Sequence, residues 1–401
     1  MKKIKFLYLF SFFLLLQMSN VNAQWNDISL SMLYNFNSVF FNNISTGYIT
    51  DYSGIVIKTT DGGNSWKALS TPQNKYFNAL YFTDLTNGYM VGDSGIILKT
   101  TNAGSTWITI SNAYNCRLNS LHFINSSTGI AVGDNGIILK STDSGNNWTY
   151  VLSPSIYILK AVSFRNNTGY AVGINGTIIK TTDGGNFWVT GTLNTTNTLN
   201  SLSLINDSIC YIAGNNGKIY KTTNAGSDWD SLINFTNENL NGIFCYQNGK
   251  CYTVGNNGVI FKSSNDASWS SQISNTSSHI NSLFFLNPDT GYVVGNNGLI
   301  LKTTDGGVDF VKEKLIDKIN ISIFPNPCIN VFYVKILTDI KIESDLLIEM
   351  QNLNGQIVLS KRVVCNDNFI MPVNITNYSK GIYFVKLINS RFVKTSKIII
   401  E

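Results

Sequence analysis

Three aspartates recur at one position of a repeating pattern and could carry out acid–base chemistry. Asp51, Asp93 and Asp134 each stand just before a turn that ends in glycine. Glycoside hydrolysis needs two opposed carboxylates, one acting as an acid and the other as a base or nucleophile. The later copies of the position lose the carboxylate and read Ile174, Asn215, Asn256 and Asn296. This drift favours a role in turn formation, and a catalytic carboxylate pair is the weaker alternative.

The other reactive side chains also lack the grouping that a site requires. His122 and His279 lie far apart and have no Cys, Asp or Glu at metal-ligand spacing, so we expect no metal and no cofactor. A lysine recurs once in each repeat, and seven ammonium groups could bind a polyanion. The favoured alternative is that each stem packs beside a tryptophan while its head reaches solvent. These lysines are Lys58, Lys99, Lys140, Lys180, Lys221, Lys262 and Lys302.

Two of the six cysteines flank a short turn. Cys245 and Cys251 enclose Asn248-Gly249, a pair typical of two-residue hairpin turns. Counting outward from such a turn places Tyr246 opposite Cys251 and makes the cysteines diagonal neighbours. That geometry is poor for a bridge, so buried free thiols are favoured over a disulfide.

The stretch Thr59–Trp66 organises the chain, because its pattern Ser/Thr-x-Asp-x-Gly-x-x-Trp returns every 40 or 41 residues. Two copies have Asn in place of Asp, the copy at Ser263–Trp269 is shortened, and the last, Thr303–Phe310, ends in Phe. A short carboxylate or amide can hold such a turn by accepting hydrogen bonds from backbone N–H groups two residues on. The tryptophan buries a large apolar area on the outer strand. The structural residues of the pattern are Asp61, Asn102, Asp143, Asp183, Asn224 and Asp305, with Trp66, Trp107, Trp148, Trp188, Trp229 and Trp269.

Each repeat contains four short β segments separated by turn residues, which predicts an all-β fold. Seven repeats arranged radially make a seven-bladed β-propeller, which we assign to residues 24–316. The segment Trp25–Leu30 resembles the strand that follows each later tryptophan, so we expect it to complete the seventh blade. Phe310–Lys314 is the alternative closing strand.

The turn pattern resembles the Asp-box, or BNR, repeats of sialidase-like propellers. The full repeat, with Gly-Tyr-x-Val-Gly-x-x-Gly followed by Ile-x-Lys-Thr-Thr-Asp-Gly-Gly-x-x-Trp, is similar to the photosystem II stability and assembly factor propellers. Sialidases use three arginines on the substrate carboxylate, whereas this propeller has only Arg117 and Arg165. The resemblance therefore implies the fold and does not carry sialidase chemistry.

Residues 1–23 have the features of a secretory signal peptide. Lys2, Lys3 and Lys5 precede the apolar run Phe6–Leu16, and cleavage is expected before Gln24. A retained membrane anchor is the alternative; otherwise we expect no stable transmembrane segment after cleavage. Residues 24–316 hold 16 Lys/Arg against 17 Asp/Glu, so a nucleic-acid partner is not expected.

Residues 317–401 leave the repeat and alternate as short strands of a small antiparallel β-sandwich. They resemble the type A sorting domain of type IX secretion at Phe324–Pro327, Asn354–Gln356, Gly381–Lys386 and Lys397–Ile400. The resemblance implies that this domain engages the secretion machinery and its sortase and is then removed. A photosystem role does not fit such an exported protein, and an ordinary adhesive sandwich is the alternative.

The position just ahead of each innermost strand varies freely, so packing does not determine it. It and its neighbours supply a candidate ligand-binding rim. The alternative is that the sequences of these loops vary without any function. We therefore predict a secreted or cell-surface, non-enzymatic module for an extracellular protein or glycan. The alternatives are a carbohydrate-active enzyme and an envelope assembly factor. The rim residues are Tyr34, Tyr76, Arg117, Tyr157, Glu238 and His279.

Overall fold

The computed structural model describes residues 25–31, 34–72, 75–232, 236–264, 268–307, 319–338, 346–353, 356–363, 369–389 and 392–401. The chain divides into two units, residues 1–308 and 309–401. The expected signal peptide and the expected boundary between residues 316 and 317 lie outside the described residues. Among the described residues, no helix is long and apolar enough to cross a membrane.

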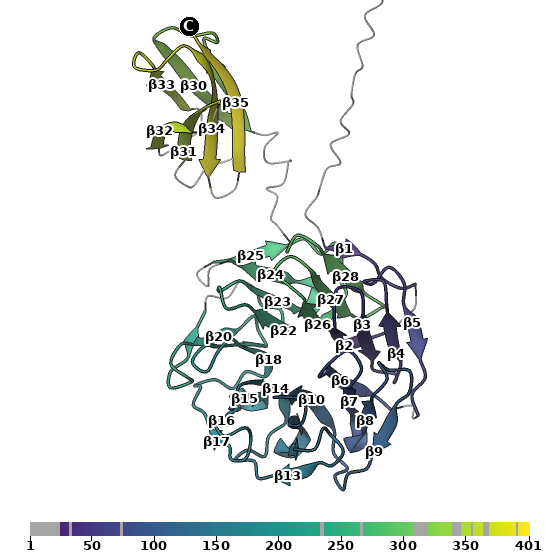
Figure 1. The fold of residues 1–401 in the computed structure, drawn as a ribbon. Helices are drawn as coiled ribbons and strands as arrows, with labels where there is room; N and C mark the ends of the chain where they lie inside the picture. The colour runs from purple at the N-terminus through teal and green to yellow at the C-terminus, as the bar shows by residue number, and fades with distance from the viewer. Residues whose placement is uncertain are drawn as a thin grey trace, which may run out of the picture. The chain divides into compact units, whose positions relative to one another are not determined.

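The first unit is a ring of seven four-stranded antiparallel sheets, as predicted (Figure 1). The strand that begins each repeat and the strand after the Asp-box turn form the two edges of each blade, and Figure 1 shows the former toward the centre of the ring. The first three blades contain β2 (Phe36–Phe41), β3 (Gly47–Asp51), β4 (Val56–Thr59) and β5 (Lys67–Leu69); β6 (Phe77–Phe82), β7 (Gly88–Gly92), β8 (Ile97–Thr100) and β9 (Ile108–Ile110); β10 (Leu118–Phe123), β11 (Gly129–Gly133), β12 (Ile138–Ser141) and β13 (Thr149–Val151).

The remaining blades repeat the same order of strands. The fourth to sixth contain β14 (Leu159–Arg165), β15 (Thr168–Gly173), β16 (Ile178–Thr181) and β17 (Val189–Thr190); β18 (Leu199–Leu204), β19 (Cys210–Gly214), β20 (Ile219–Thr222) and β21 (Asp230–Ser231); β22 (Leu240–Cys245), β23 (Cys251–Gly255), β24 (Ile260–Ser263) and β25 (Trp269–Gln272). The seventh contains β26 (Ile280–Phe285), β27 (Gly291–Gly295), β28 (Ile300–Thr303) and β1 (Asn26–Asp27).

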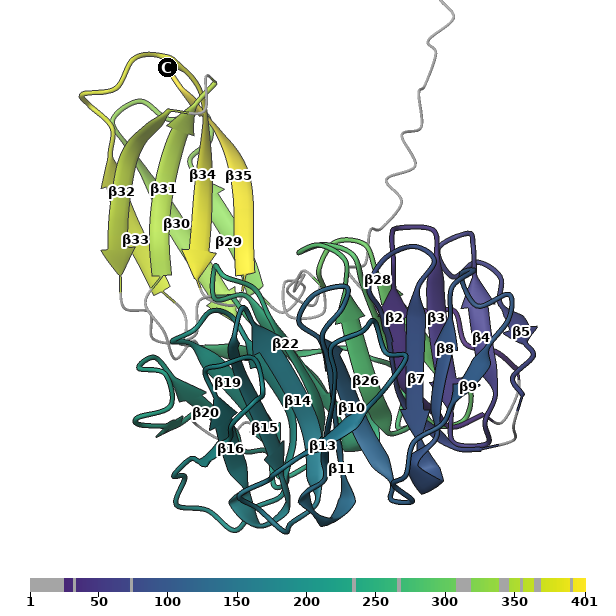
Figure 2. The same ribbon diagram turned by 60° about the horizontal axis from the view of Figure 1, so that its bottom comes forward.

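The N-terminal strand closes the ring by pairing with β28, which confirms the predicted latch. Figure 1 shows β1 beside β28, and Figure 2 shows the same blade, with β26 and β28, next to β2. Asn26 pairs with Lys302 and Asp27 with Leu301 in antiparallel register. Trp25 is 2% exposed, and its ring meets the ring of Phe285 edge-on at 5.9 Å. The alternative closing strand at residues 310–314 lies outside the described residues.

Aromatic rings join each blade to the next. The Tyr89 ring stacks on Phe123 of the following blade with centroids 4.1 Å apart, and Trp148 meets the same Phe123 edge-on at 6.0 Å. Gly129 faces that phenyl ring so closely that a Cβ there would lie 2.7 Å from it. The second strand of each blade is buried along its length because neighbouring blades cover both of its faces.

The side chains of the Asp-box turns bond within the turn, but their hydrogen bonds differ from the expected pattern. The carboxylate of Asp61 accepts from the backbone N–H of Ser65, four residues on rather than two, at 2.9 Å. Thr59 Oγ1 accepts from the Gly63 N–H at 2.9 Å and donates to Asp61 at 2.8 Å. The turn is therefore a closed network of a hydroxyl, a carboxylate and two backbone amides.

The lysine heads bond across blades rather than simply reaching solvent, which corrects the expectation. Lys58 Nζ donates to the Ala103 carbonyl in the next Asp-box turn at 2.8 Å, and the Tyr48 hydroxyl donates to the same oxygen at 2.9 Å. Structural bonds of this kind leave little support for a polyanion-binding ring. The equivalent lysines that donate to a carbonyl of the following turn are Lys99, Lys140, Lys180, Lys262 and Lys302.

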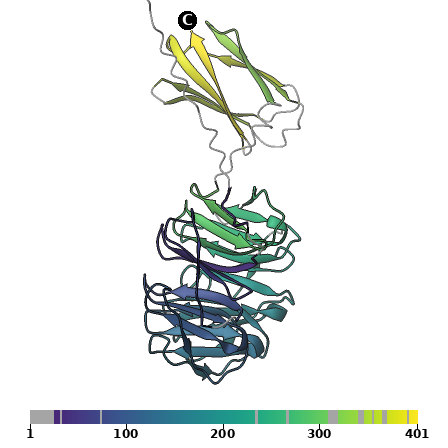
Figure 3. The same cartoon turned by 90° about the vertical axis from the view of Figure 1, so that its right-hand side faces the viewer.

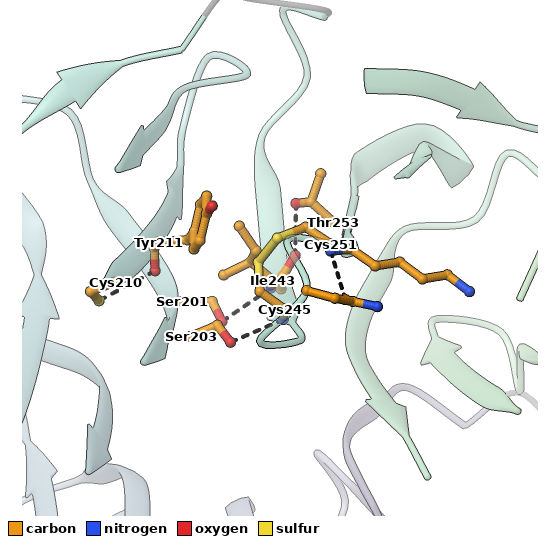
Figure 4. Close-up of a disulfide and its surroundings, with 11 residues drawn as sticks. Ser201, Ser203, Cys210, Tyr211, Ile243, Cys245, Cys251 and Thr253 are labelled. Atoms are coloured by element: carbon orange, nitrogen blue, oxygen red, sulfur yellow. Dashed lines mark hydrogen bonds between the residues drawn. A yellow bond between two sulfur atoms is a disulfide. The ribbon is translucent and has the colours of Figure 1, made fainter. Parts of the chain in front are cut away.

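Cys245 and Cys251 form a disulfide, so the expectation of free thiols was wrong (Figure 4). The hairpin has a three-residue loop, because Tyr246 N–H donates to the Lys250 carbonyl and Gly249 takes a positive φ of 79°. This register places the cysteines directly opposite each other, with their Cα atoms 4.1 Å apart. The assumed two-residue turn had displaced the register by one residue.

The second unit is the predicted antiparallel sandwich, and its two sheets are visible in Figure 3. Phe332, Val334, Ile348, Met350 and Val385 are fully buried between them. One sheet contains β29 (Ile319–Phe324), β30 (Val331–Thr338) and β33 (Phe369–Asn374), and the other contains β32 (Ile357–Val363), β31 (Leu346–Asn352), β34 (Gly381–Asn389) and β35 (Phe392–Ile400).

Candidate binding site

Strand register separates the two faces of the ring. Phe36, where the innermost strand of the first blade begins, pairs with Asp51, whereas Phe41 pairs with Gly47 at the other end. The turns between second and third strands share the first end, and the Asp-box turns lie at the other. We call the end where the innermost strands begin the rim face.

The variable rim position is held by its backbone, which explains why its side chain is free to change. The Tyr76 carbonyl accepts from the Asp93 N–H at 3.0 Å, and the Arg117 carbonyl accepts from the Asp134 N–H at 2.9 Å. A Cβ at Gly92 would lie 1.9 Å from the Tyr76 oxygen, so the close approach requires glycine. The fold uses the carbonyl of the rim residue and leaves the side chain available for binding.

Three of the predicted rim residues meet in one cavity of about 530 Å3, which we call the rim cavity. Tyr34, Tyr76 and Arg117 line it, together with Tyr52 and Asp93. Arg117 Nε lies 3.0 Å from Asp93 Oδ1. Tyr76 and Tyr52 are 53% and 42% exposed, so their rings are available to a ligand. The cavity thus combines tyrosine rings with an oriented guanidinium group.

The other three predicted residues lie elsewhere on the rim face. Tyr157 is exposed and lines a separate cavity of about 420 Å3. Glu238 contributes its backbone carbonyl, which accepts from the Gly217 N–H at 2.7 Å. His279 Nδ1 accepts from the Asn257 N–H at 3.1 Å. The six residues therefore do not form a single site.

Sequence reasoning missed a ring of asparagines at the second residue of the innermost strands. Asn119 shows the arrangement: its amide donates to the Leu159 carbonyl of the next blade at 3.0 Å and to Asp134 Oδ1 of its own blade at 2.9 Å. Lys160 takes this position in the fourth blade. In an alignment of the repeats, this asparagine stands between an apolar and a small residue. That alignment position would have revealed the ring. Its asparagines are Asn37, Asn78, Asn119, Asn200, Asn241 and Asn281.

These asparagines line a second cavity of about 520 Å3, the mouth cavity, together with Lys160, Arg117, Tyr52 and Ile174. Lys160 Nζ donates to Asn200 Oδ1 at 2.8 Å. The Lys160 side chain reaches solvent through the cavity, and protein atoms surround the rest of it. Burial lowers the pKa of Lys160, and the nearby Arg117 charge lowers it further. Two cations therefore face one polar cavity.

The three aspartates of the second-to-third turns make structural hydrogen bonds. Asp51 is 2% exposed and accepts from the Ser53 and Ile55 N–H groups at 2.9 and 2.8 Å. Asp93 pairs with Arg117, and Asp134 accepts from Asn119. These bonds support the turn interpretation over a catalytic pair. Within the described part of the chain, no cluster of three His, Cys, Asp or Glu side chains could hold a metal ion.

Fold and turns together define a seven-bladed Asp-box propeller followed by a small β-sandwich. The family model described as photosynthesis system II assembly factor YCF48 matches residues 17–115, 66–157 and 110–285. The chain therefore belongs to this family. Residues 322–401 match the secretion system C-terminal sorting domain, which indicates export by type IX secretion and engagement of its machinery.

Solved propellers share the fold at low sequence identity. A structure titled "YCF48 bound to D1 peptide" is 20% identical with a TM-score of 0.61, covering 70% of this chain and 94% of its own. YCF48 from Cyanidioschyzon merolae is 17% identical with a TM-score of 0.61, covering 70% and 98%. The WD40 propeller of Doa1 is 14% identical with a TM-score of 0.58, covering 70% and 95%. No curated protein matches the chain.

Proposed function

We propose that the propeller is an exported, non-enzymatic module that binds an extracellular protein or glycan through the rim cavity. The observation that carries this proposal is the convergence of Tyr34, Tyr76 and Arg117 in one cavity. Tyr76 and Arg117 stand at the variable position, where the fold uses the backbone carbonyl. Tyrosine and arginine are enriched among the residues that dominate binding energy. Their large contact area and planar donor group suit them to recognition.

The comparisons support the proposal in two ways. The sorting domain supports a location outside the cell, which we take to be secretion or display on the surface after signal-peptide export. A YCF48 structure is titled as bound to a D1 peptide, so a peptide complex is known for a propeller of this family. For this chain we propose that residues 317–401 engage the secretion machinery and its sortase, while the propeller engages the extracellular partner.

The test is capture of a partner from extracellular material with the exported protein and with a Tyr76→Ala, Arg117→Ala double variant. We expect the double variant to lose binding while its melting temperature changes little, because exposed side chains contribute little to folding. Tyr157→Ala is the matched control, since this exposed tyrosine lies on the same face in a different cavity. Binding that survives the double variant but disappears after charge changes at the Asp-box turns would place the site on the opposite face.

A further inference from the structure

The asparagine ring is broken in one blade at two linked positions. Asn119 bonds within its own blade to Asp134 and across to the next blade. In the fourth blade the corresponding pair is Lys160 and Ile174, so the bond within the blade has no acceptor side chain. Six other blades show that asparagine satisfies the fold at this position. The lysine is therefore a departure that ring closure does not require.

This departure places an uncompensated charge in the mouth cavity. Lys160 Nζ donates to the neutral amide oxygen of Asn200, and no carboxylate of the described residues lies within ion-pair distance of it. Arg117 lines the same cavity, and its positive charge lowers the pKa of Lys160 further. Asp134 is the one carboxylate on the cavity wall, and it accepts from Asn119. Arg117 already pairs with Asp93, so an anionic group that enters the cavity would chiefly compensate the unpaired charge of Lys160.

The mouth cavity and the rim cavity are adjacent, because Tyr52 and Arg117 line both. Together they offer a charged end at Lys160, a wall of primary amides, and tyrosine rings at Tyr34, Tyr52 and Tyr76. The amides suit hydroxyl groups, and tyrosine faces suit the C–H faces of pyranose rings. An apolar peptide side chain would instead desolvate the amides without replacing their bonds to water.

We infer that the two adjacent cavities together bind an acidic oligosaccharide, with one uronate carboxylate between Lys160 and Arg117 and the adjoining sugars over the tyrosines. The inference rests on the proposed binding function and names the ligand class for the same site. The carboxylate forms charge-assisted hydrogen bonds with both cations, which are about twice as strong as neutral ones. The sugars beyond it provide contact area and selectivity.

The test is calorimetric titration of the exported protein with a hexamer of galacturonic acid and with its carboxyl-reduced counterpart. We expect the acidic hexamer to bind at least roughly tenfold more tightly than the reduced hexamer. Added salt should weaken the binding of the acidic hexamer only. Lys160→Asn should remove that preference. It also installs the residue that the other six blades use, so the variant should fold. Lys67→Asn is the control, because it removes the same charge from an exposed outer strand.

Equal binding of the two hexamers, or equal effects of Lys160→Asn and Lys67→Asn, would overturn the inference. If both hexamers bind equally and Tyr76→Ala abolishes both, the acidic preference is wrong while the binding function stands. If neither hexamer binds but a peptide carboxylate binds in a manner sensitive to Lys160→Asn, the ligand class is wrong. Failure of the binding function itself would appear separately, as equal partner capture by the wild type and the Tyr76→Ala, Arg117→Ala variant.

Discussion

The ammonium group of Lys302 in the last blade donates a hydrogen bond to the carbonyl of Gly62 in the first blade, at 2.8 Å. The Tyr292 hydroxyl donates to the same oxygen at 2.9 Å, and the Tyr292 ring stacks on Phe41 at 3.8 Å. The junction where the two ends of the ring meet thus uses the same side-chain contacts as the other blade boundaries. The latch strand adds backbone pairing on the outer edge of the last blade.

Replacing Lys302 with methionine should weaken this junction by about 1–3 kcal/mol, because the Gly62 carbonyl loses a charged donor. Methionine keeps most of the stem that packs beside Tyr292. The free energy of unfolding in denaturant measures the effect. Lys67→Met, on an exposed outer strand, is the control and should change little. Equal stability of the two variants would show that the junction does not depend on the ammonium group.

Replacing Trp25 with alanine should lower the free energy of unfolding by about 3–5 kcal/mol, the usual cost of removing a buried tryptophan. Trp25 is 2% exposed and meets Phe285 edge-on, so its loss leaves a cavity beneath the latch. Asn26→Ala alters an exposed residue of the same strand and should be nearly neutral. Thermal unfolding that is unchanged in Trp25→Ala would mean that the latch does not stabilise the ring.

Acid should weaken the ring through the Asp-box turns. Hydrogen bonds from Ser65 and then Thr59 lower the pKa of Asp61 from its ordinary value of 3.8 to about 2, and bonds led by Asn147 do the same for Asp143. A lowered folded pKa gives stability that is present above 3.8 and is lost as pH falls toward 2. Asp61→Asn with Asp143→Asn should flatten the dependence of melting temperature on pH in that window.

The two substitutions are conservative because two other blades already use asparagine in the same turn. Asn102 Oδ1 accepts from the Thr106 N–H at 2.9 Å, as Asp61 Oδ1 does from Ser65. The neutral pair of substitutions should therefore leave melting near pH 7 close to that of the wild type. If the double variant loses stability over the same pH range as the wild type, other carboxylates cause the acid sensitivity.

Removing the Cys245–Cys251 disulfide should cost about 2 kcal/mol, since the bridge closes a short loop. The measurement is the unfolding free energy of Cys245→Ala, Cys251→Ala, with Cys116→Ala, a partly exposed free cysteine, as the control. Alkylation before reduction should leave peptides containing Cys245 and Cys251 unmodified. Full alkylation of both in the oxidised protein would contradict the bridge.

Truncation after residue 316 should separate export from folding. The propeller has its own ring-shaped core, so in a type IX host the shortened chain should accumulate as a folded protein in the periplasm. Cell fractionation followed by limited proteolysis measures location and folding together. Normal secretion of the shortened chain would contradict the assignment of residues 317–401 as the export signal.

Sequence periodicity was sufficient to predict the ring, because every repeat contains its own turn glycine and six of the seven end in a tryptophan. The latch was also predictable, since Trp25 stands at the repeat spacing before Trp66. Loop length was not predictable from Asn248-Gly249 alone. A two-residue and a three-residue turn suit the same dipeptide, and only the packed register shows which one forms.

The site was predictable only in part. Tyr34, Tyr76 and Arg117 precede the innermost strands of three consecutive blades, and adjacency in the ring brings them together. Glu238 precedes the innermost strand of the sixth blade, away from these three. His279 belongs to the seventh blade, which borders the first, but its ring accepts a hydrogen bond from Asn257 of the sixth blade. The role of Lys160 depends on the inward direction of its side chain, which repeat alignment does not specify unless the asparagine column is examined.

The pairing of Asn26 with Lys302 also determines the order in which this protein can fold. The strand at the start of the chain can pair only after the last blade has been synthesised. Until then the nascent chain has one sheet edge unpaired. Contacts between such distant residues form slowly because a long loop must close first. Completion of the circle is therefore a late folding event, during which the open edge is exposed to chaperones, to proteases and to other copies of the same chain.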